Sequence, residues 1–186
     1  MKDKEGKVNA FEKIVGRCLE EYGYWVRHSV KVSISKQEKR DIGSFSMPTP
    51  EIDIVALNVK RNELLLLEVK SLLGSYGVHF DAVSGKDKEE GKRYKLFTNA
   101  KFIKAVTTQL RKEYLDQGLI TQDTKISYGL AAGHIHSADE AKIAEYFAEK
   151  GWTLFTPTKI KESVRQLSEK GWEDDLVTMT SKLVLK

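Results

Sequence analysis

Three charged residues lie within two otherwise apolar segments of this chain. Asp53 falls inside Ile52-Asp-Ile-Val-Ala-Leu57, and Glu68 and Lys70 close the run Leu64-Leu-Leu-Leu-Glu-Val-Lys70. Such charges are costly to bury unless they are paired or bound to a metal ion. Because side chains alternate along a strand, Glu68 and Lys70 are expected on the same face, about 6.6 Å apart along the chain.

These residue types and spacings are typical of metal-assisted hydrolysis. If the two segments pair as a hairpin, Asp53 approaches Glu68 across the ladder. Neighbouring carboxylates repel each other, and a divalent cation that prefers oxygen ligands relieves the repulsion. Lys70 would lie beside that cation, where its amino group could act on a bound water molecule. A buried ion pair between Lys70 and a carboxylate, or strand ends that reach solvent, explains the same charges equally well.

The segments that must position these residues predict an α/β protein. Asn9 and Glu12 have the spacing of a helix capping box, followed by apolar residues at helical spacing. Residues 24–34 alternate as a strand with their apolar side chains on one face. Residues 35–50 are polar, and because two prolines lie near their end we expect no regular helix there.

The rest of the chain alternates strands and helices. Residues 52–59 and 63–71 predict a hairpin that is apolar on both faces, as central strands are. Residues 71–99 lack a clean period, which is unusual in a compact domain unless the stretch is functional or partly structured. Helices are expected at 102–115, 137–150 and 158–170, strands at 126–132 and 152–155, and residues 177–185 are ambiguous. This order predicts a single domain over residues 1–186, with a mixed central β-sheet flanked by helices.

The composition favours a soluble globular protein, with 40% hydrophobic and 31% charged residues. No apolar run is long enough to cross a bilayer. The charged first residues are not followed by the apolar region of a secretory signal. A single cysteine excludes an internal disulfide framework. We therefore expect a cytoplasmic protein that does not associate with membranes.

Positive charge is concentrated in the middle of the chain. Residues 91–125 hold eight basic and three acidic residues, a local charge of +5 against +4 for the whole chain. This excess favours nucleic-acid binding, with Lys92, Arg93 and Lys95 as candidates for phosphate contacts. A solvated helix face accounts for it equally well.

The histidines give a weaker signal. His134-Ile-His136 follows an apolar strand, and His79 lies among aromatic residues in the irregular stretch. A metal pair on a strand is one interpretation of His134 and His136. We instead expect a loop there, leading to a helix that Ser137 caps.

The two charged segments also resemble a known signature. Pro50-Glu-Ile-Asp53, fourteen residues and then Glu68-Val-Lys70 resemble the PD-(D/E)XK motif of the restriction-endonuclease-like superfamily. The resemblance covers about residues 9–165 and is closest to Mrr-like nucleases and archaeal Holliday-junction resolvases. It is carried further by Phe11-Glu12, Gly23-Tyr24, Gln109-Leu110 and Gly151-Trp-Thr-Leu-Phe-Thr156.

The resemblance implies a restriction-endonuclease-like fold and Mg²⁺-dependent hydrolysis of DNA phosphodiester bonds, with Mn²⁺ able to substitute. Asp53, Glu68 and the backbone carbonyl of Val69 would bind the metal ion. Lys70 would orient or deprotonate the attacking water, or stabilise the transition state. The proline lies three residues before Asp53, so Glu51 is a rival acid.

Two further residues are assigned by the resemblance, and each has a plainer interpretation. Glu12 would contact the metal ion directly or through water, although it could serve only as the capping partner of Asn9. Gln109 would position the substrate or Lys70, although it could be an exposed helix residue. The alternative functions are a Holliday-junction resolvase and a catalytically inactive nucleic-acid-binding module. A two-fold homodimer would suit cleavage of both DNA strands.

Overall fold

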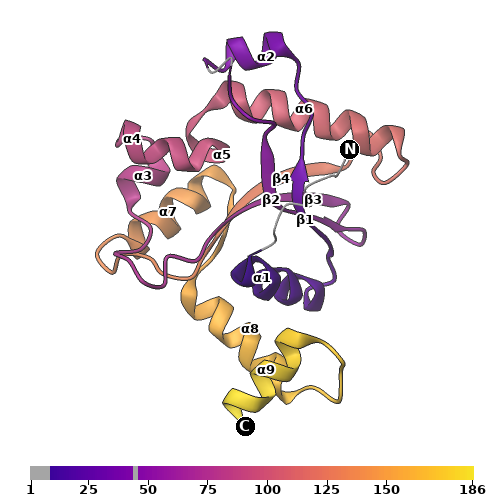
Figure 1. The fold of residues 1–186 in the computed structure, drawn as a ribbon, viewed down its shortest axis with the longest axis vertical. Helices are drawn as coiled ribbons and strands as arrows, with labels where there is room; N and C mark the ends of the chain where they lie inside the picture. The colour runs from indigo at the N-terminus through magenta and orange to yellow at the C-terminus, as the bar shows by residue number, and fades with distance from the viewer. Residues whose placement is uncertain (1–8, 44–45) are drawn as a thin grey trace.

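A five-stranded mixed sheet forms the centre of the molecule (Figure 1). The computed structural model describes residues 9–43 and 46–186. Neighbouring strands in the order β1-β2-β3 are antiparallel, whereas β4 is parallel to β3 and β5 is parallel to β4. The strands are β1 (Trp25–Lys31), β2 (Glu51–Asn58), β3 (Glu63–Lys70), β4 (Lys125–Ala132) and β5 (Thr153–Phe155).

Helices cover both faces of the sheet, with α1 on one side and α6 on the other (Figure 1). They are α1 (Ala10–Glu21), α2 (Lys36–Asp41), α3 (Phe80–Ser84), α4 (Lys88–Gly91), α5 (Lys95–Thr98), α6 (Ala100–Asp116), α7 (Glu140–Lys150), α8 (Pro157–Glu169) and α9 (Leu176–Leu185), with a 3₁₀ helix at Lys92–Tyr94. The prediction of an α/β domain with a mixed sheet between helices is thereby confirmed.

The leucines of β3 belong to two separate cores, as its apolar sequence predicts. Leu64 and Leu66 are fully buried on the side that includes Val106 of α6. Leu65 and Leu67 are buried on the opposite side, with Leu19 of α1. Strand alternation distributes the side chains between the two faces. This central strand is therefore held rigidly up to Glu68 and Lys70 at its end.

The strand β1 does not keep its apolar side chains on one face, contrary to the expectation. Val26 packs against the α1 core, whereas Val30 packs against the α6 core. Between them Ser29 has φ 50°, in the left-handed region. This conformation reverses the alternation of the strand.

Residues 35–50, where no regular helix was expected, contain one, and residues 71–99, which lack a clean period, are partly helical. Ser35 and Glu38 form a reciprocal capping box that starts α2, which ends well before the prolines. Residues 71–99 contain three short α-helices and a 3₁₀ helix, each too short to produce a recognisable period. The ambiguous residues 177–185 belong to α9.

The start of α7 also differs from the prediction. Asp139, and not Ser137, occupies the N-cap position, and it makes no side-chain capping hydrogen bond. The carboxylate of Asp139 instead faces His79, His136 and the backbone N–H of Phe80.

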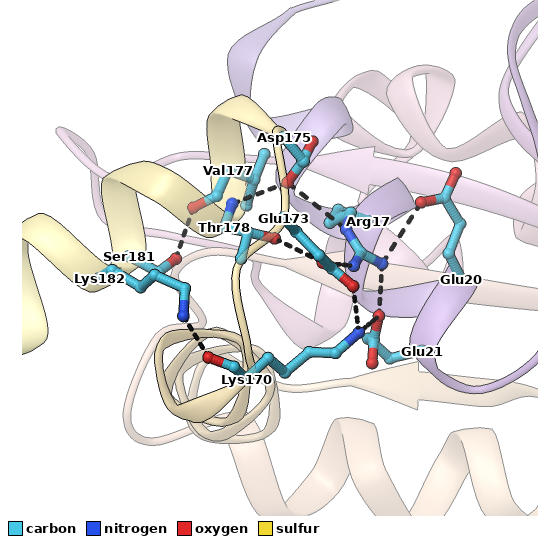
Figure 2. A network of polar contacts seen from close by, with 10 residues as sticks. All are labelled: Arg17, Glu20, Glu21, Lys170, Glu173, Asp175, Val177, Thr178, Ser181 and Lys182. Atoms are coloured by element: carbon cyan, nitrogen blue, oxygen red, sulfur yellow. Dashed lines mark hydrogen bonds and ion pairs between the residues drawn. The ribbon is translucent and has the colours of Figure 1, made fainter.

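A network of ion pairs ties the C-terminal helices to α1 (Figure 2). Arg17 of α1 pairs with Glu173 and Asp175, which lie between α8 and α9. Lys170 pairs with Glu21 and with Glu173, at 2.8 Å each. No helix among the described residues is long and apolar enough to cross a membrane.

Candidate active site at the end of the central hairpin

The two charged segments form the predicted hairpin, and its open end carries the candidate site. The last backbone pair before that end is Ile54 with Leu67, so the same register places Asp53 opposite Glu68. The carboxylate of Asp53 accepts a hydrogen bond from the backbone N–H of Val69 at 2.7 Å. Asp53 is thus held against the backbone between Glu68 and Lys70.

The alternation of β2 breaks at Asp53. Ile52 and Val55 both face the α6 core, although three positions separate them. The register of β1 and β2 places Ser29, with its positive φ, opposite Asp53. The sheet is therefore irregular on both sides of this aspartate, which leaves its side chain able to reach the end of β3.

Lys70 and Glu68 lie on the same face, as their spacing predicts. Lys70 Nζ donates to the Glu68 carboxylate, and the two side chains are 20% and 17% exposed. Lys70 Nζ also lies 5.8 Å from the centre of the Tyr94 ring. This largely buried ion pair is one of the plainer interpretations of the two charges, and it brings an amine and a carboxylate together beside Asp53.

Glu12 reaches the same region from the first turn of α1. Its backbone N–H donates to the Asn9 side chain at 2.9 Å, and the Asn9 amide donates to the Glu12 carboxylate. Burial raises the pKa of Glu12, and the negative charges of Asp53 and Glu51 raise it further. Glu12 therefore both takes part in capping α1 and lies near Asp53.

The buried carboxylates hold their protons more tightly than free ones. Burial raises the pKa of Glu68 to about 7, with the charges of Asp53 and Glu12 adding to the rise and Lys70 opposing it. Burial also raises the pKa of Asp53, against Lys70 and the Val69 N–H. A bound cation would stabilise the ionised forms. The all-oxygen donor set fits a hard ion such as Mg²⁺.

The donor atoms are not gathered into a closed metal cage. Within residues 9–43 and 46–186, Glu12, Asp53 and Glu68 do not form a group whose ligand atoms all lie within 4.8 Å of one another. Asp53 is engaged by the Val69 N–H, and Glu68 is engaged by Lys70. These contacts satisfy carboxylates that a cation would otherwise bind.

A cavity of about 580 Å³ opens beside the hairpin end. Glu68 and Glu51 line it on the acidic side. Its basic lining residues are Lys31 and the three predicted phosphate contacts, Lys92, Arg93 and Lys95. The cavity is therefore lined by all three predicted phosphate contacts and by Glu68 of the predicted catalytic residues, whereas Asp53 and Lys70 are not among its lining residues.

Part of the positive charge in this cavity is balanced by neighbouring acids. Lys92 pairs with Glu89 at 2.7 Å and Arg93 pairs with Glu90 at 3.0 Å, each pair one helical turn apart. These side chains are more than half exposed. Such exposed pairs are weak and exchange readily for other partners.

Gln109 is not brought to the site. It is half-buried on α6 and donates to Glu113 of the same helix at 2.7 Å. It is not among the residues that line the cavity, which α6 meets through Phe102, about two turns earlier. A role for Gln109 beside Lys70 therefore stays a prediction from the family resemblance.

Sequence reasoning missed Lys31 as a cavity residue and the position of Tyr94 beside Lys70. Lys31 ends β1 and pairs in register with Glu51, so a correct alignment of the first two strands would have identified it. Tyr94 is buried in the stretch without a clean period, and burial raises its pKa to about 12. No local pattern around Tyr94 indicates that its ring would lie near Lys70.

Comparison with known proteins does not assign a function to this site. Searches against protein-family models, curated proteins and solved structures found no match. The function is therefore judged on the geometry of Asp53, Glu68 and Lys70 and on the cavity beside them.

Proposed function

We propose that this protein is a divalent-metal-dependent nuclease with a restriction-endonuclease-like fold that hydrolyses DNA phosphodiester bonds. The observation that carries this proposal is the convergence of Asp53, Glu68 and Lys70 at the open end of one hairpin, beside a cavity with basic walls. Two acids and a lysine beside a cavity form the chemical set that the motif implies.

The metal ion would be held by Asp53, Glu68 and the backbone carbonyl of Val69, with Glu12 close by. When bound, Mg²⁺ or Mn²⁺ lowers the pKa of a water ligand and neutralises charge on the phosphate. Since Glu68 now accepts from Lys70, binding of the cation would compete with that ion pair.

Lys70 would be the residue that acts on the attacking water. Released from Glu68, its amine can orient the water or accept its proton, and its N–H groups can stabilise the negative charge that develops on the phosphate. The Tyr94 ring lies over this amine, with its centre 5.8 Å from Lys70 Nζ. Glu12 would act more indirectly, through its charge beside Asp53.

The basic residues of the cavity would bind the DNA backbone. Lys92, Arg93 and Lys95 would exchange their present partners for phosphates, and Lys31 lies across the same cavity. These contacts carry no sequence information by themselves. The choice of DNA over RNA follows from the family resemblance alone.

The test is cleavage of linear, circular, single-stranded and four-way DNA in Mg²⁺, Mn²⁺ or EDTA. We expect cleavage with either metal ion, none in EDTA, and none by the Asp53→Asn variant. Asp116→Asn serves as the matched control, because this exposed carboxylate lies at the end of α6. Strong preference for four-way DNA would favour the resolvase alternative. Metal-independent binding without cleavage would favour the inactive binding module and overturn the nuclease proposal.

A further inference from the structure

A second group of chemically active side chains lies where the segment after β3 meets the loop between β4 and α7. His79, His136 and Asp139 each offer one ligand atom, and these atoms all lie within 4.8 Å of one another. In the described parts of the chain this is the one such group of three. Its nitrogen and oxygen donors differ from the all-carboxylate set at the hairpin end.

The backbone determines how the two histidines meet. Val78 and Ile135 form an isolated parallel β-bridge. The N–H of Val78 donates to the backbone carbonyl of His134, and the N–H of His136 donates to the backbone carbonyl of Val78, both at 3.0 Å. The residue after Val78 is His79, and the residue after Ile135 is His136. The rings of His79 and His136 consequently lie with their centres 4.6 Å apart.

A glycine makes this close approach of the two segments possible. Gly77 has φ 86°, and a Cβ atom at this position would lie 3.0 Å from three backbone atoms of residues 134–136. Any larger residue would push the segments apart. A turn after His136 brings Asp139 to the two histidines, and in this turn the N–H of Asp139 donates to the carbonyl of His136 at 2.9 Å.

The spacing of the donor atoms suits a shared ion, and the contact between His79 and Asp139 is also within hydrogen-bond distance. Asp139 Oδ2 lies 3.3 Å from His79 Nδ1 and 3.6 Å from His136 Nδ1. In tetrahedral zinc sites, with bonds of about 2.0–2.1 Å, neighbouring donor atoms are about 3.3–3.4 Å apart. A hydrogen bond at 3.6 Å is too long to count as one.

His136 Nδ1 lacks the hydrogen-bond partner that a buried polar atom needs. This buried atom has no hydrogen-bond partner in the described structure, although the residue as a whole is partly exposed. Asp139 Oδ2, 3.6 Å away, accepts from the backbone N–H of Phe80 at 3.3 Å and also contacts His79 Nδ1. Lys142 lies 3.8 Å from the other oxygen of Asp139. A cation at the centre of the group would give His136 Nδ1 the partner that it lacks.

We propose that His79, His136 and Asp139 bind a Zn²⁺ ion. Imidazole nitrogen with one carboxylate suits zinc and related late first-row ions, whereas Mg²⁺ prefers oxygen ligands. The ion would fasten the segment after β3 to the β4–α7 loop. This proposal does not depend on the proposed nuclease activity, because none of its ligands belongs to the hairpin end.

The test is titration with zinc alone of the full chain without a histidine tag, after EDTA treatment and dialysis. It is carried out in the Asp53→Asn, Glu68→Gln background, so that the hairpin carboxylates cannot supply the site. We expect one Zn²⁺ per chain by calorimetry, and intense visible absorption when Co²⁺ replaces zinc. Excess Mg²⁺ should not displace the ion.

Single substitutions then identify the ligands. His136→Gln and Asp139→Asn should each weaken Zn²⁺ binding by at least about tenfold. His134→Gln is the matched control, because His134 lies two residues from His136 but contacts the Ser75 carbonyl at 2.8 Å, and it should bind zinc like the parent. His79→Gln provides an independent ligand variant if either of the first two fails to fold by circular dichroism.

The proposal would be overturned by either of two results. The first is the absence of zinc binding at micromolar concentrations in the background variant, including the case in which only the parent with intact Asp53 and Glu68 binds the ion. The second is zinc affinity that stays unchanged in folded His136 and Asp139 variants.

Discussion

At the scale of single residues, Glu12 combines two roles that mutations can separate. It caps α1 together with Asn9 and lies close enough to Asp53 for their charges to interact. We predict that Glu12→Gln lowers cleavage less than Asp53→Ala or Glu68→Ala, each of which should abolish it. Because Glu12 acts at one remove from the metal ion, more Mg²⁺ or added Mn²⁺ should partly restore the rate.

Asn9→Ala is the matched control, because it removes the cap and keeps the carboxylate. Loss of the cap should lower the free energy of unfolding by about 1 kcal/mol while retaining activity per folded molecule. Turnover and melting temperature are measured on both variants. Equal loss of activity in Asn9→Ala and Glu12→Gln would show that Glu12 acts only as a capping residue.

The raised pKa of Glu68 predicts how stability depends on pH without metal. Burial moves this pKa from 4.5 to about 7, so between these values the folded protein binds more protons than the unfolded chain. The contribution of Glu68 to the free energy of unfolding should therefore fall as the pH rises from about 4.5 to about 7 in EDTA, whereas His28, whose pKa burial lowers, contributes in the opposite direction. Glu68→Gln should remove the contribution of Glu68, so the free energy of unfolding of the parent relative to this variant should fall over the interval, and Mg²⁺ should counteract that fall.

Urea unfolding at several pH values in EDTA measures this effect. The comparison uses the slope with pH and not the absolute stability, because Glu68→Gln also alters the contact with Lys70. A free energy of unfolding of the parent that rises over this interval relative to that of Glu68→Gln would contradict the charge arrangement described at the hairpin end.

At the scale of elements, Arg17 joins α1 to the segment between the last two helices, beside the ion pair of Lys170 with Glu21. Arg17 is 13% exposed and pairs with acids of its own helix and with Glu173 and Asp175 (Figure 2). We predict that Arg17→Met loosens α9, so that its amides exchange hydrogen faster while those of β3 do not. Arg165→Met, an exposed change on α8, should leave exchange unchanged.

Acid should loosen the same helices. Hydrogen bonds from Lys170 and Arg17 lower the pKa of Glu173 from 4.5 to about 2. The stabilisation from this glutamate is complete above pH 4.5 and is lost as the pH falls toward about 2. In Arg17→Met this acid dependence should be smaller. Hydrogen exchange of α9 at falling pH measures it, and identical acid profiles of parent and variant would disprove the assignment.

At the scale of the whole molecule, the basic cavity predicts how salt affects DNA binding. Replacing Lys92, Arg93 and Lys95 together by alanine should weaken affinity and reduce the slope of log affinity against log salt, by about 0.9 for each phosphate that is no longer neutralised. Replacing Lys150, Lys161 and Lys186 removes the same charge from exposed positions that do not line the cavity. This control should retain the parental slope, and equal changes in both triple variants would place the DNA elsewhere.

Local sequence patterns were sufficient to predict the long helices and strands of the fold and the position of Asp53 opposite Glu68. Helical spacing after Asn9 predicted α1, and two apolar runs joined by a short turn predicted the β2–β3 hairpin. Once the hairpin formed, the register of Ile54 with Leu67 brought Asp53 to Glu68. These features follow from residues close in the chain, so periodicity was enough to find them.

The meeting of distant residues depends instead on how the elements pack. Gln109 lies on nearly the same face of α6 as the cavity-lining Phe102, but about two turns further along the helix, where it contacts Glu113. His136 lies beside His79, and not in a pair with His134, because a parallel bridge joins Val78 to Ile135. The short helices of residues 71–99 contact one another and α6, and α3 also contacts α7. Contacts such as the bridge of Val78 with Ile135 join segments far apart in the chain, so no local pattern records them.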